Sequence, residues 1–525
     1  MKCNILNISN NTLINLIRDG SILGSNINTQ LLHCHILKSG YFSNGFILKS
    51  LINSYSKLEL ISEAHKLFDE IAEPTVVSWN TIISGYVRSG QCRNALYMFL
   101  QLEKSDISSD SYSLTAALSA CGQLSLLQFG RTIHSKIVKL GEECNVVVAN
   151  CLIDMYGKCG YVDSFTKVFN QLVEKDNISW NSVIAANVRN QKVEDALGIF
   201  RHMPNADRIS YNEIINGVAL FGEVEDAVAI LYSMPCPNSS SWNSIITGYV
   251  NRGRGREALD FFSKMHLSAV EMDQFTFSTV LSGIASIAAV TWGTLVHCRT
   301  MKYGLDSSIV VGSALLDMYF KCGRVKEAEL VFRTMPKKNL ITWNTMISGY
   351  AHNGSAAKAI ELYELLVEVK DLQPDDITFL NVLSACWHNR IPLSIANQYI
   401  ETMIKNYGIH PTVEHCCVMV RLMGQEGDLS RAEEIINKSG FDSCGSVWRA
   451  LLSACVTCRD IEVAKMAARK VIELERDNEF VYVQMSNIYA SHGEWRSASE
   501  LRKLMFGRRV MKEPGCSWVE LDNII

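Results

Sequence analysis

The chain contains the stretch VVSWNTIISGY at residues 76–86, and shorter copies of it recur three more times. The four copies share a Ser/Thr-Trp-Asn tripeptide, centred on Trp79, Trp180, Trp242 and Trp343. These tryptophans lie 101, 62 and 101 residues apart. Units of 31 and 35 residues account for all three spacings, and Tyr211 marks the unit inside the 62-residue gap. The sequence is therefore a tandem array of short repeats.

Each repeat carries the pattern of two helices. From Trp79 to Tyr86, apolar side chains recur at i, i+3, i+4 and i+7, which indicates one face of a helix. Gly90 marks the end of that helix, and a second apolar face runs from Ala95 to Leu102. Neither helix can bury its face alone, but stacked neighbours can. We therefore predict an all-α protein, a right-handed α-solenoid superhelix of helix-turn-helix repeats of 31, 35 and 36 residues.

The recurring tryptophans and glycines are expected to serve packing. The tryptophans lie on the apolar face of the first helix, so we assign them to the core. Gly85, Gly248 and Gly349 recur on first helices where neighbouring helices must approach closely.

Composition limits the class of protein. Of the 525 residues, 48% are hydrophobic and 20% are charged, which excludes a disordered chain. The formal net charge of −4 lacks the basic surplus typical of many nucleic-acid binders. Residues 277–296 form the best candidate for a membrane span, but serines and glycines interrupt them and their register matches the repeat at 113–133. We expect no membrane segment.

Residues that could form a catalytic zinc site occur in the wrong order. A zinc deaminase needs His-x-Glu followed by Pro-Cys-x-x-Cys. Here Cys455 and Cys458 precede His492 and Glu494. We therefore predict no catalytic residues, no metal and no cofactor. His134 and His297 recur at one place in the repeat and are interpreted as packing residues.

The repeats resemble the pentatricopeptide repeat (PPR) family in its plant PLS subclass. Residues 76–110, 239–273 and 340–375 resemble its P motifs. Residues 111–145 and 274–308 resemble L motifs, with GRTIH at 130–134 and GTLVH at 293–297. Residues 146–176 and 309–339 resemble S motifs, with MYGKCG at 155–160 and MYFKCG at 318–323. A weaker L and S pair covers 10–44 and 45–75.

The C-terminal part is similar to the E subgroup of this family. VWRALLSAC at 447–455 and MSNIYA at 485–490 resemble the two halves of the E extension. EPGCSW at 513–518 resembles the box that introduces a DYW deaminase domain, and the chain stops at Ile525. We divide the chain into a short segment at 1–9, an array of about thirteen repeats at 10–442, an E-type extension at 443–512 and a tail at 513–525.

The resemblance implies a function in RNA editing. E-class proteins are site-recognition factors for organellar cytidine-to-uridine editing, so we expect single-stranded RNA and a DYW-type deaminase acting in trans as partners. A mitochondrion, or alternatively a plastid, is the expected location, although no transit peptide is evident. Transcript stabilisation, processing or splicing is the main alternative. A protein-binding scaffold is a second alternative, but tetratricopeptide repeats have a uniform period of 34.

In the family that the chain resembles, the fifth and last residues of each repeat read one RNA base. The predicted base-reading residues are the pairs Asn80 and Asp110, Thr115 and Asn145, Asn150 and Asp176, Asn181 and Asp207, Asn212 and Asn238, Asn243 and Asp273, Ser278 and Ser308, Ser313 and Asn339, and Asn344 and Asp375. The second residue of the repeat packs on the base, which assigns Val77, Val147, Ile178, Ile209, Val310 and Ile341. Helix capping is the alternative role for the closing Asn and Asp residues.

The family's pairing rules translate these pairs into a sequence. Asn with Asp favours uracil, Thr or Ser with Asn favours adenine, and Asn with Asn favours a pyrimidine. Read 5′ to 3′ from the repeat at Val76, the expected RNA is U, A, U, U, pyrimidine, U, unassigned, A, U. Lys49 and Leu380 depart from the fifth-position pattern, so their units are not expected to read a base sharply.

Overall fold

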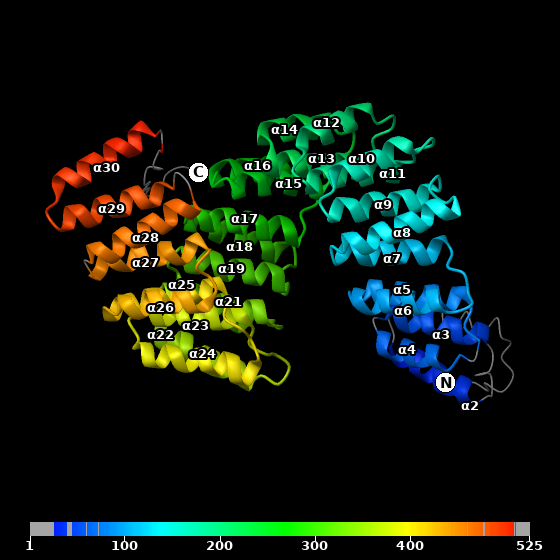
Figure 1. The fold of residues 1–525 in the computed structure, drawn as a ribbon, viewed down its shortest axis with the longest axis horizontal. Coiled ribbons are helices and arrows are strands. Elements are labelled where there is room, and N and C mark those ends of the chain that lie inside the picture. The colour runs from blue at the N-terminus through cyan, green and yellow to red at the C-terminus, as the bar shows by residue number, and fades with distance from the viewer. Residues whose placement is uncertain are drawn as a thin grey trace. The chain divides into compact units, whose positions relative to one another are not determined.

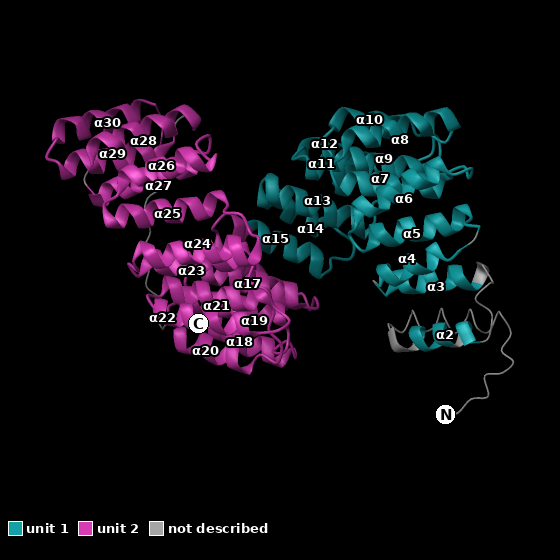
Figure 2. Ribbon diagram, turned by 60° about the horizontal axis from the view of Figure 1, so that its bottom comes forward, with its two compact units in different colours: residues 1–248 teal, residues 249–525 magenta. Residues whose placement is uncertain are grey.

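The protein is all-helical and consists of stacked helix pairs. The computed structural model describes residues 26–38, 45–58, 60–71, 73–458, 460–475, 478–508 and 510, which form 29 helices and no strand. The described helices follow one another as antiparallel pairs (Figure 1). They divide into two compact units, residues 1–248 and 249–525 (Figure 2). The prediction of an α-solenoid of helix-turn-helix repeats is confirmed.

The first unit comprises the helices up to most of α15. Their bounds are α2 Asn26–Lys38, α3 Gly45–Lys57, α4 Ile61–Asp69, α5 Val76–Arg88, α6 Cys92–Lys104, α7 Ser111–Gln123, α8 Leu127–Leu140, α9 Val146–Lys158, α10 Val162–Gln171, α11 Asn177–Arg189, α12 Val193–His202, α13 Arg208–Phe221, α14 Val224–Ser233 and α15 Ser239–Asn251.

The second unit begins within the last turn of α15. Its further helices are α16 Gly255–Leu267, α17 Gln274–Ser286, α18 Val290–Lys302, α19 Ile309–Lys321, α20 Val325–Thr334, α21 Leu340–His352, α22 Ala356–Glu368, α23 Asp376–His388, α24 Leu393–Tyr407, α25 Val413–Glu426, α26 Leu429–Ser439, α27 Gly445–Cys458, α28 Ile461–Leu474, α29 Glu479–Ser491 and α30 Trp495–Gly507.

The first helices of successive repeats pack side by side. In the first unit α5, α7, α9, α11 and α13 contact one another in that order, and in the second unit α17, α19, α21, α23, α25 and α27 do the same. These helices begin at the residues that open the predicted repeats, from Val76 through Leu340. The two units do not coincide with the predicted division at residues 442 and 443, which stays a prediction.

The recurring tryptophans pack against the core, as predicted: Trp79 and Trp242 are buried, and Trp180 and Trp343 are half-buried. The ring of Trp79 lies 4.7 Å from Phe68 of the preceding repeat, in an edge-on arrangement. Trp180 meets Phe169 at 5.0 Å and Trp343 meets Phe332 at 5.2 Å in the same way. Such edge contacts add to the area that the rings bury. The fourth residue of these repeats therefore joins one repeat to the next.

The recurring glycines lie where first helices touch, again as predicted. A Cβ atom at Gly349 would lie 2.2 Å from the ring of Phe320 on the neighbouring first helix. A Cβ at Gly248 would lie 2.8 Å from the carbonyl oxygen of Ala219. Both distances are shorter than van der Waals contact, so a side chain there would push the repeats apart.

The repeated histidines hold neighbouring repeats together. His134 Nδ1 lies 2.8 Å from the hydroxyl of Tyr156, and His297 Nδ1 lies 2.8 Å from that of Tyr319. Burial lowers the pKa of both histidines from the ordinary value of 6.5. The interpretation as packing residues is confirmed, and the neutral imidazole is the form that fits.

The residues considered above for a membrane span and for a zinc site lie in ordinary helices of the repeats. Residues 277–296 are split between α17 and α18, and no helix among the described residues is long and apolar enough to cross a membrane. Cys455 is buried on α27, and the Cys458 thiol donates to the carbonyl of Gly424 at 2.8 Å. The structure therefore accounts for both cysteines by packing. The predicted segments 1–9 and 513–525 lie outside the described residues.

Candidate nucleic-acid interface

The closing residue of a repeat caps the first helix of the next repeat. The Asp110 carboxylate accepts from the backbone N–H of Ser113 at 2.9 Å, and Asp375 accepts from that of Thr378 at 2.8 Å. The same arrangement occurs at Asn145, Asp176, Asp207, Asp273, Ser308 and Asn339. Helix capping is therefore a real role of these positions.

Within the described part of each compact unit, four of these caps in all also bind the fifth residue of their own repeat. Asn80 Nδ2 donates to both carboxylate oxygens of Asp110, at 2.8 and 3.1 Å. The other three pairs are Asn150 with Asp176 at 3.3 Å, Asn181 with Asp207 at 3.2 Å, and Asn344 with Asp375 at 3.0 Å. Capping and pairing thus coexist, so a capping role does not argue against base reading.

Four other predicted pairs, each within one compact unit, are not joined in this way. Within the part of the chain that the structure describes, no hydrogen bond joins Thr115 to Asn145, Asn212 to Asn238, Ser278 to Ser308 or Ser313 to Asn339. The hydroxyls of Thr115 and Ser278 donate to backbone carbonyls of their own helices. Asn243 and Asp273 belong to different compact units.

Hydrogen bonds favour the ionised form of three paired carboxylates, those of Asp110, Asp176 and Asp207. Burial by itself would raise the pKa of Asp110, but hydrogen bonds from Ser113 and Asn80 outweigh burial and lower it. The same balance lowers the pKa of Asp176 and Asp207. At neutral pH these side chains are therefore acceptors only, and each can accept a hydrogen bond from a base.

In nine repeats the second residue is an exposed apolar side chain, whereas the repeat at 239–273 has Ser240 there. Exposure among the predicted base-packing residues ranges from 40% for Val310 to 65% for Ile341, with Val77, Val147, Ile178 and Ile209 between them. The structure adds three residues at the same position: Tyr112, Phe275 and Ile377, exposed by 73%, 59% and 52%. The prediction left them out, although counting two residues into the repeats at 111, 274 and 376 would have found them.

One reading pair lies in a groove between neighbouring first helices. The groove has a volume of about 450 Å³ and contains Asn344 and Asp375. Ile341 and Ile377, the second residues of two successive repeats, also line it. Lys321, which forms an ion pair with Asp317 at 2.9 Å, lies in the same groove. The volume falls within the range of small-ligand sites, about 300–1,000 Å³.

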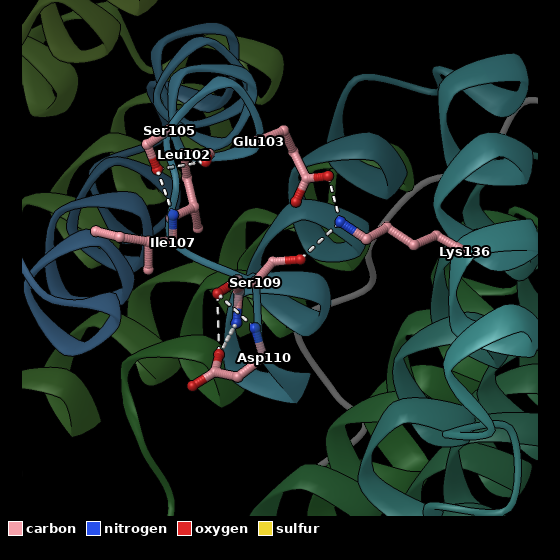
Figure 3. Close-up of polar contacts among 8 residues, drawn as sticks. Leu102, Glu103, Ser105, Ile107, Ser109, Asp110 and Lys136 are labelled. Carbon is pink, nitrogen blue, oxygen red and sulfur yellow. Dashed lines mark hydrogen bonds and ion pairs between the residues drawn. The ribbon is translucent and has the colours of Figure 1, made fainter.

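A second contact fixes the loop before Asp110. Lys136 on α8 forms an ion pair with Glu103 on α6 and donates to the Ser109 hydroxyl at 2.8 Å (Figure 3). Ser109 directly precedes Asp110 (Figure 3). The neighbouring second helix therefore holds the residue before Asp110, while the cap contact with Ser113 holds the Asp110 carboxylate itself.

Comparison with known proteins agrees with this architecture. PPR repeat models match residues 46–73, 74–123, 147–177, 178–207, 237–286, 313–340 and 338–388. A putative pentatricopeptide repeat-containing protein of Arabidopsis thaliana is 50% identical over 512 residues, which cover 97% of this chain and 89% of the relative. The chain belongs to the pentatricopeptide repeat family.

The family match includes the C-terminal part. The E motif matches residues 458–520, which places this PPR protein in the E subgroup. Two further Arabidopsis PPR-containing proteins, named mitochondrial and chloroplastic, are 32% and 31% identical. The alignments cover 94% of this chain and 67% and 65% of those relatives. The crystal structure of PPR10 from maize matches with 18% identity and a TM-score of 0.43, over 96% of this chain and 74% of PPR10.

Proposed function

We propose that this PPR protein binds single-stranded RNA and reads its sequence with the fifth and last residues of its repeats. The observation that carries the proposal is the groove at Asn344 and Asp375. There, a hydrogen-bonded amide and carboxyl group share one groove with the apolar side chains of Ile341 and Ile377. Apolar side chains cover the faces of a base, while the polar pair meets its edge.

The chemistry of the pair suits uracil. Asn Nδ2 carries two hydrogens, of which the Asp carboxylate takes one. The other can be donated to the O4 acceptor of uracil, where cytosine presents an N4 amino donor instead. A mismatched base would leave a desolvated polar group unpaired, which costs about 1–3 kcal/mol.

Selection from a random RNA pool tests this proposal. The purified full-length protein is expected to enrich RNAs that contain U-A-U-U-pyrimidine-U-N-A-U. A DNA pool run in parallel is expected to give weaker binding. Enrichment of no sequence, with the protein folded by circular dichroism, would contradict base reading.

We further propose that the protein is a site-recognition factor for cytidine-to-uridine editing and recruits a DYW-type deaminase in trans. The E motif supports this assignment. The last described helix, α30, presents Trp495 and Phe506 with 70% and 87% exposure, and such apolar side chains suit a protein partner.

An editing assay with a separate deaminase tests the recruitment step. The purified protein alone is expected to deaminate nothing. Trp495→Ser combined with Phe506→Ser should abolish editing in trans but leave RNA affinity unchanged. Val173→Ser, at a position that is 91% exposed in the first unit, is the matched control and should edit normally. Editing by the lone protein would overturn the proposal.

We place the protein in an organelle, the mitochondrion in the first instance. The support is that relatives carry mitochondrial or chloroplastic names. Sequencing mitochondrial and plastid RNA from plants with and without the protein decides both the location and the function. Loss of editing at a site 3′ of the predicted motif is expected, whereas altered transcript ends or splicing with normal editing would favour the alternative.

A further inference from the structure

The four joined Asn–Asp pairs are not held equally. In the 35- and 36-residue repeats, Asn80 and Asn344 donate to their carboxylates at 2.8 and 3.0 Å. In the 31-residue repeats, the shortest corresponding distances from Asn150 and Asn181 are 3.3 and 3.2 Å. The longer repeats therefore hold the nitrogen end of the amide more closely.

The contacts to the oxygen end of the amide differ more clearly between the long and the short repeats. The Ser113 hydroxyl lies 2.5 Å from Asn80 Oδ1 and 2.9 Å from Asp110 Oδ1. The Thr378 hydroxyl lies 2.8 Å from Asn344 Oδ1 and 2.7 Å from Asp375 Oδ1. In both repeats, one buried hydroxyl of the next repeat lies within hydrogen-bond distance of both members of the pair, and the two acceptor oxygens share its single hydrogen.

The equivalent hydroxyls in the short repeats reach only the carboxylate. Ser179 and Ser210 donate to Asp176 and Asp207 at 2.8 Å each. Asn150 Oδ1 and Asn181 Oδ1 are buried, and neither has a hydrogen-bond partner among the described residues. Their amides are therefore anchored through nitrogen alone.

We propose that Ser113 and Thr378 are positioning residues that fix the reading amides of Asn80 and Asn344. As a consequence, these two repeats discriminate uracil from cytosine more sharply than the repeats of Asn150 and Asn181 do. This inference rests on the proposed reading of RNA bases.

The physical reason is the orientation of the amide. Held at both ends, Asn80 presents an N–H donor in one fixed direction, towards which uracil places the O4 acceptor and cytosine an N4 donor. Held at one end, Asn150 can tilt about its side-chain torsions and relieve the unfavourable contact with cytosine. Preorganisation of this kind raises selectivity without adding a contact to the base.

The test compares hydroxyl deletions in the full-length protein. RNAs are made from the sequence that the random pool enriches, with U or C at the nucleotide facing each of the four pairs. Fluorescence anisotropy then gives the ratio of the Kd for C to the Kd for U at each position. In the unmodified protein this ratio should be larger at the nucleotides facing Asn80 and Asn344 than at those facing Asn150 and Asn181.

The variants isolate the hydroxyl. Ser113→Ala should lower the ratio at its own nucleotide about five- to tenfold, the effect of about one hydrogen bond. Ser113→Thr should retain the ratio because the hydroxyl stays. Ser179→Ala is the control, since it removes a hydroxyl that donates to the closing carboxylate but contacts no asparagine, and it should change its own ratio by less than about twofold. Thr378→Val removes the corresponding hydroxyl beside Asn344, and it should lower the ratio at the nucleotide facing Asn344 in the same way.

The outcomes separate the two proposals. If the unmodified protein distinguishes U from C at none of the four positions, base reading itself fails. If it discriminates but Ser113→Ala and Thr378→Val change nothing, or Ser179→Ala causes an equal loss, base reading stands and the positioning role is overturned. Circular dichroism of each variant confirms that the fold is intact.

Discussion

At the scale of single residues, one aspartate performs two tasks. Asp375 caps α23 through the backbone N–H of Thr378 and accepts a hydrogen bond from Asn344. The first contact stabilises the fold, and the second orients the amide that we propose reads the base. A substitution at the asparagine therefore tests reading while the cap remains.

Asn344→Thr should move the base preference at its nucleotide from uracil towards guanine, because Asp375 remains and Thr replaces the amide by a hydroxyl. The loss of preference for uracil should be about 1–3 kcal/mol. Competition binding with the four bases at that nucleotide measures it. The nucleotide facing Asn80 and Asp110 in the same variant is the internal control. An unchanged preference with an intact fold would show that this pair only caps the helix.

At the scale of the helix, histidine–tyrosine contacts join successive repeats. His134 and His297 bind Tyr156 and Tyr319, and burial lowers the pKa of both histidines. The folded protein thus binds fewer protons than the unfolded chain just below pH 6.5. The free energy of unfolding therefore rises with pH across the interval between the lowered pKa and about 6.5, and it falls as the solution is acidified.

Urea unfolding between pH 5.5 and 7.5 checks this dependence. Each histidine should contribute a slope of at most about 1.4 kcal/mol per pH unit. His134→Gln with His297→Gln should flatten the dependence, because glutamine does not titrate in this range. An identical pH dependence in the double variant would contradict the assignment.

Close packing between first helices also requires a glycine at position 349. Gly349→Ala should lower the free energy of unfolding by about 1–3 kcal/mol, because the added methyl group would overlap the ring of Phe320. Gly198→Ala is the matched control: no atom outside its own helix lies within 4 Å of a Cβ there, so alanine should stabilise α12 by about 0.5–1 kcal/mol. Equal effects of the two changes in urea unfolding would refute the close-packing argument.

At the scale of the whole molecule, we expect charge to contribute only modestly to RNA binding. The formal net charge is −4, and basic residues at the ends of first helices are partly neutralised by their own acidic neighbours. Lys158 pairs with Asp154 at 2.6 Å, and Lys321 pairs with Asp317 at 2.9 Å. Base contacts should therefore supply more of the affinity than phosphate contacts do.

RNA affinity should depend weakly on salt. Between 50 and 200 mM salt, the Kd for the selected RNA should rise less than about tenfold, as expected for one or two phosphate contacts to a single strand. A gel-shift series over salt measures the slope, with an unrelated RNA of equal length as control. A steep slope, or equal affinity for both RNAs, would show that binding is mainly electrostatic.

Several features of the molecule followed from the sequence by itself. The first helices begin at Val76, Ser111, Val146 and the later predicted repeat openings because apolar spacing, caps and turns are local signals repeated many times. The family resemblance likewise assigned the fifth and last residues of each repeat to one RNA base. The structure joins Asn80 to Asp110 by a hydrogen bond, and base reading by this pair stays a prediction.

Only the tertiary structure decided how firmly each pair is held. Ser113 and Ser179 occupy the same place in the sequence repeat, yet only Ser113 reaches an asparagine oxygen. The second helix before Ser113, α6, has 13 residues, whereas α10 before Ser179 has 10. Contacts across repeats depend on where the preceding second helix places the next first helix. The sequence pattern of a single repeat does not specify the distances between side chains of neighbouring repeats.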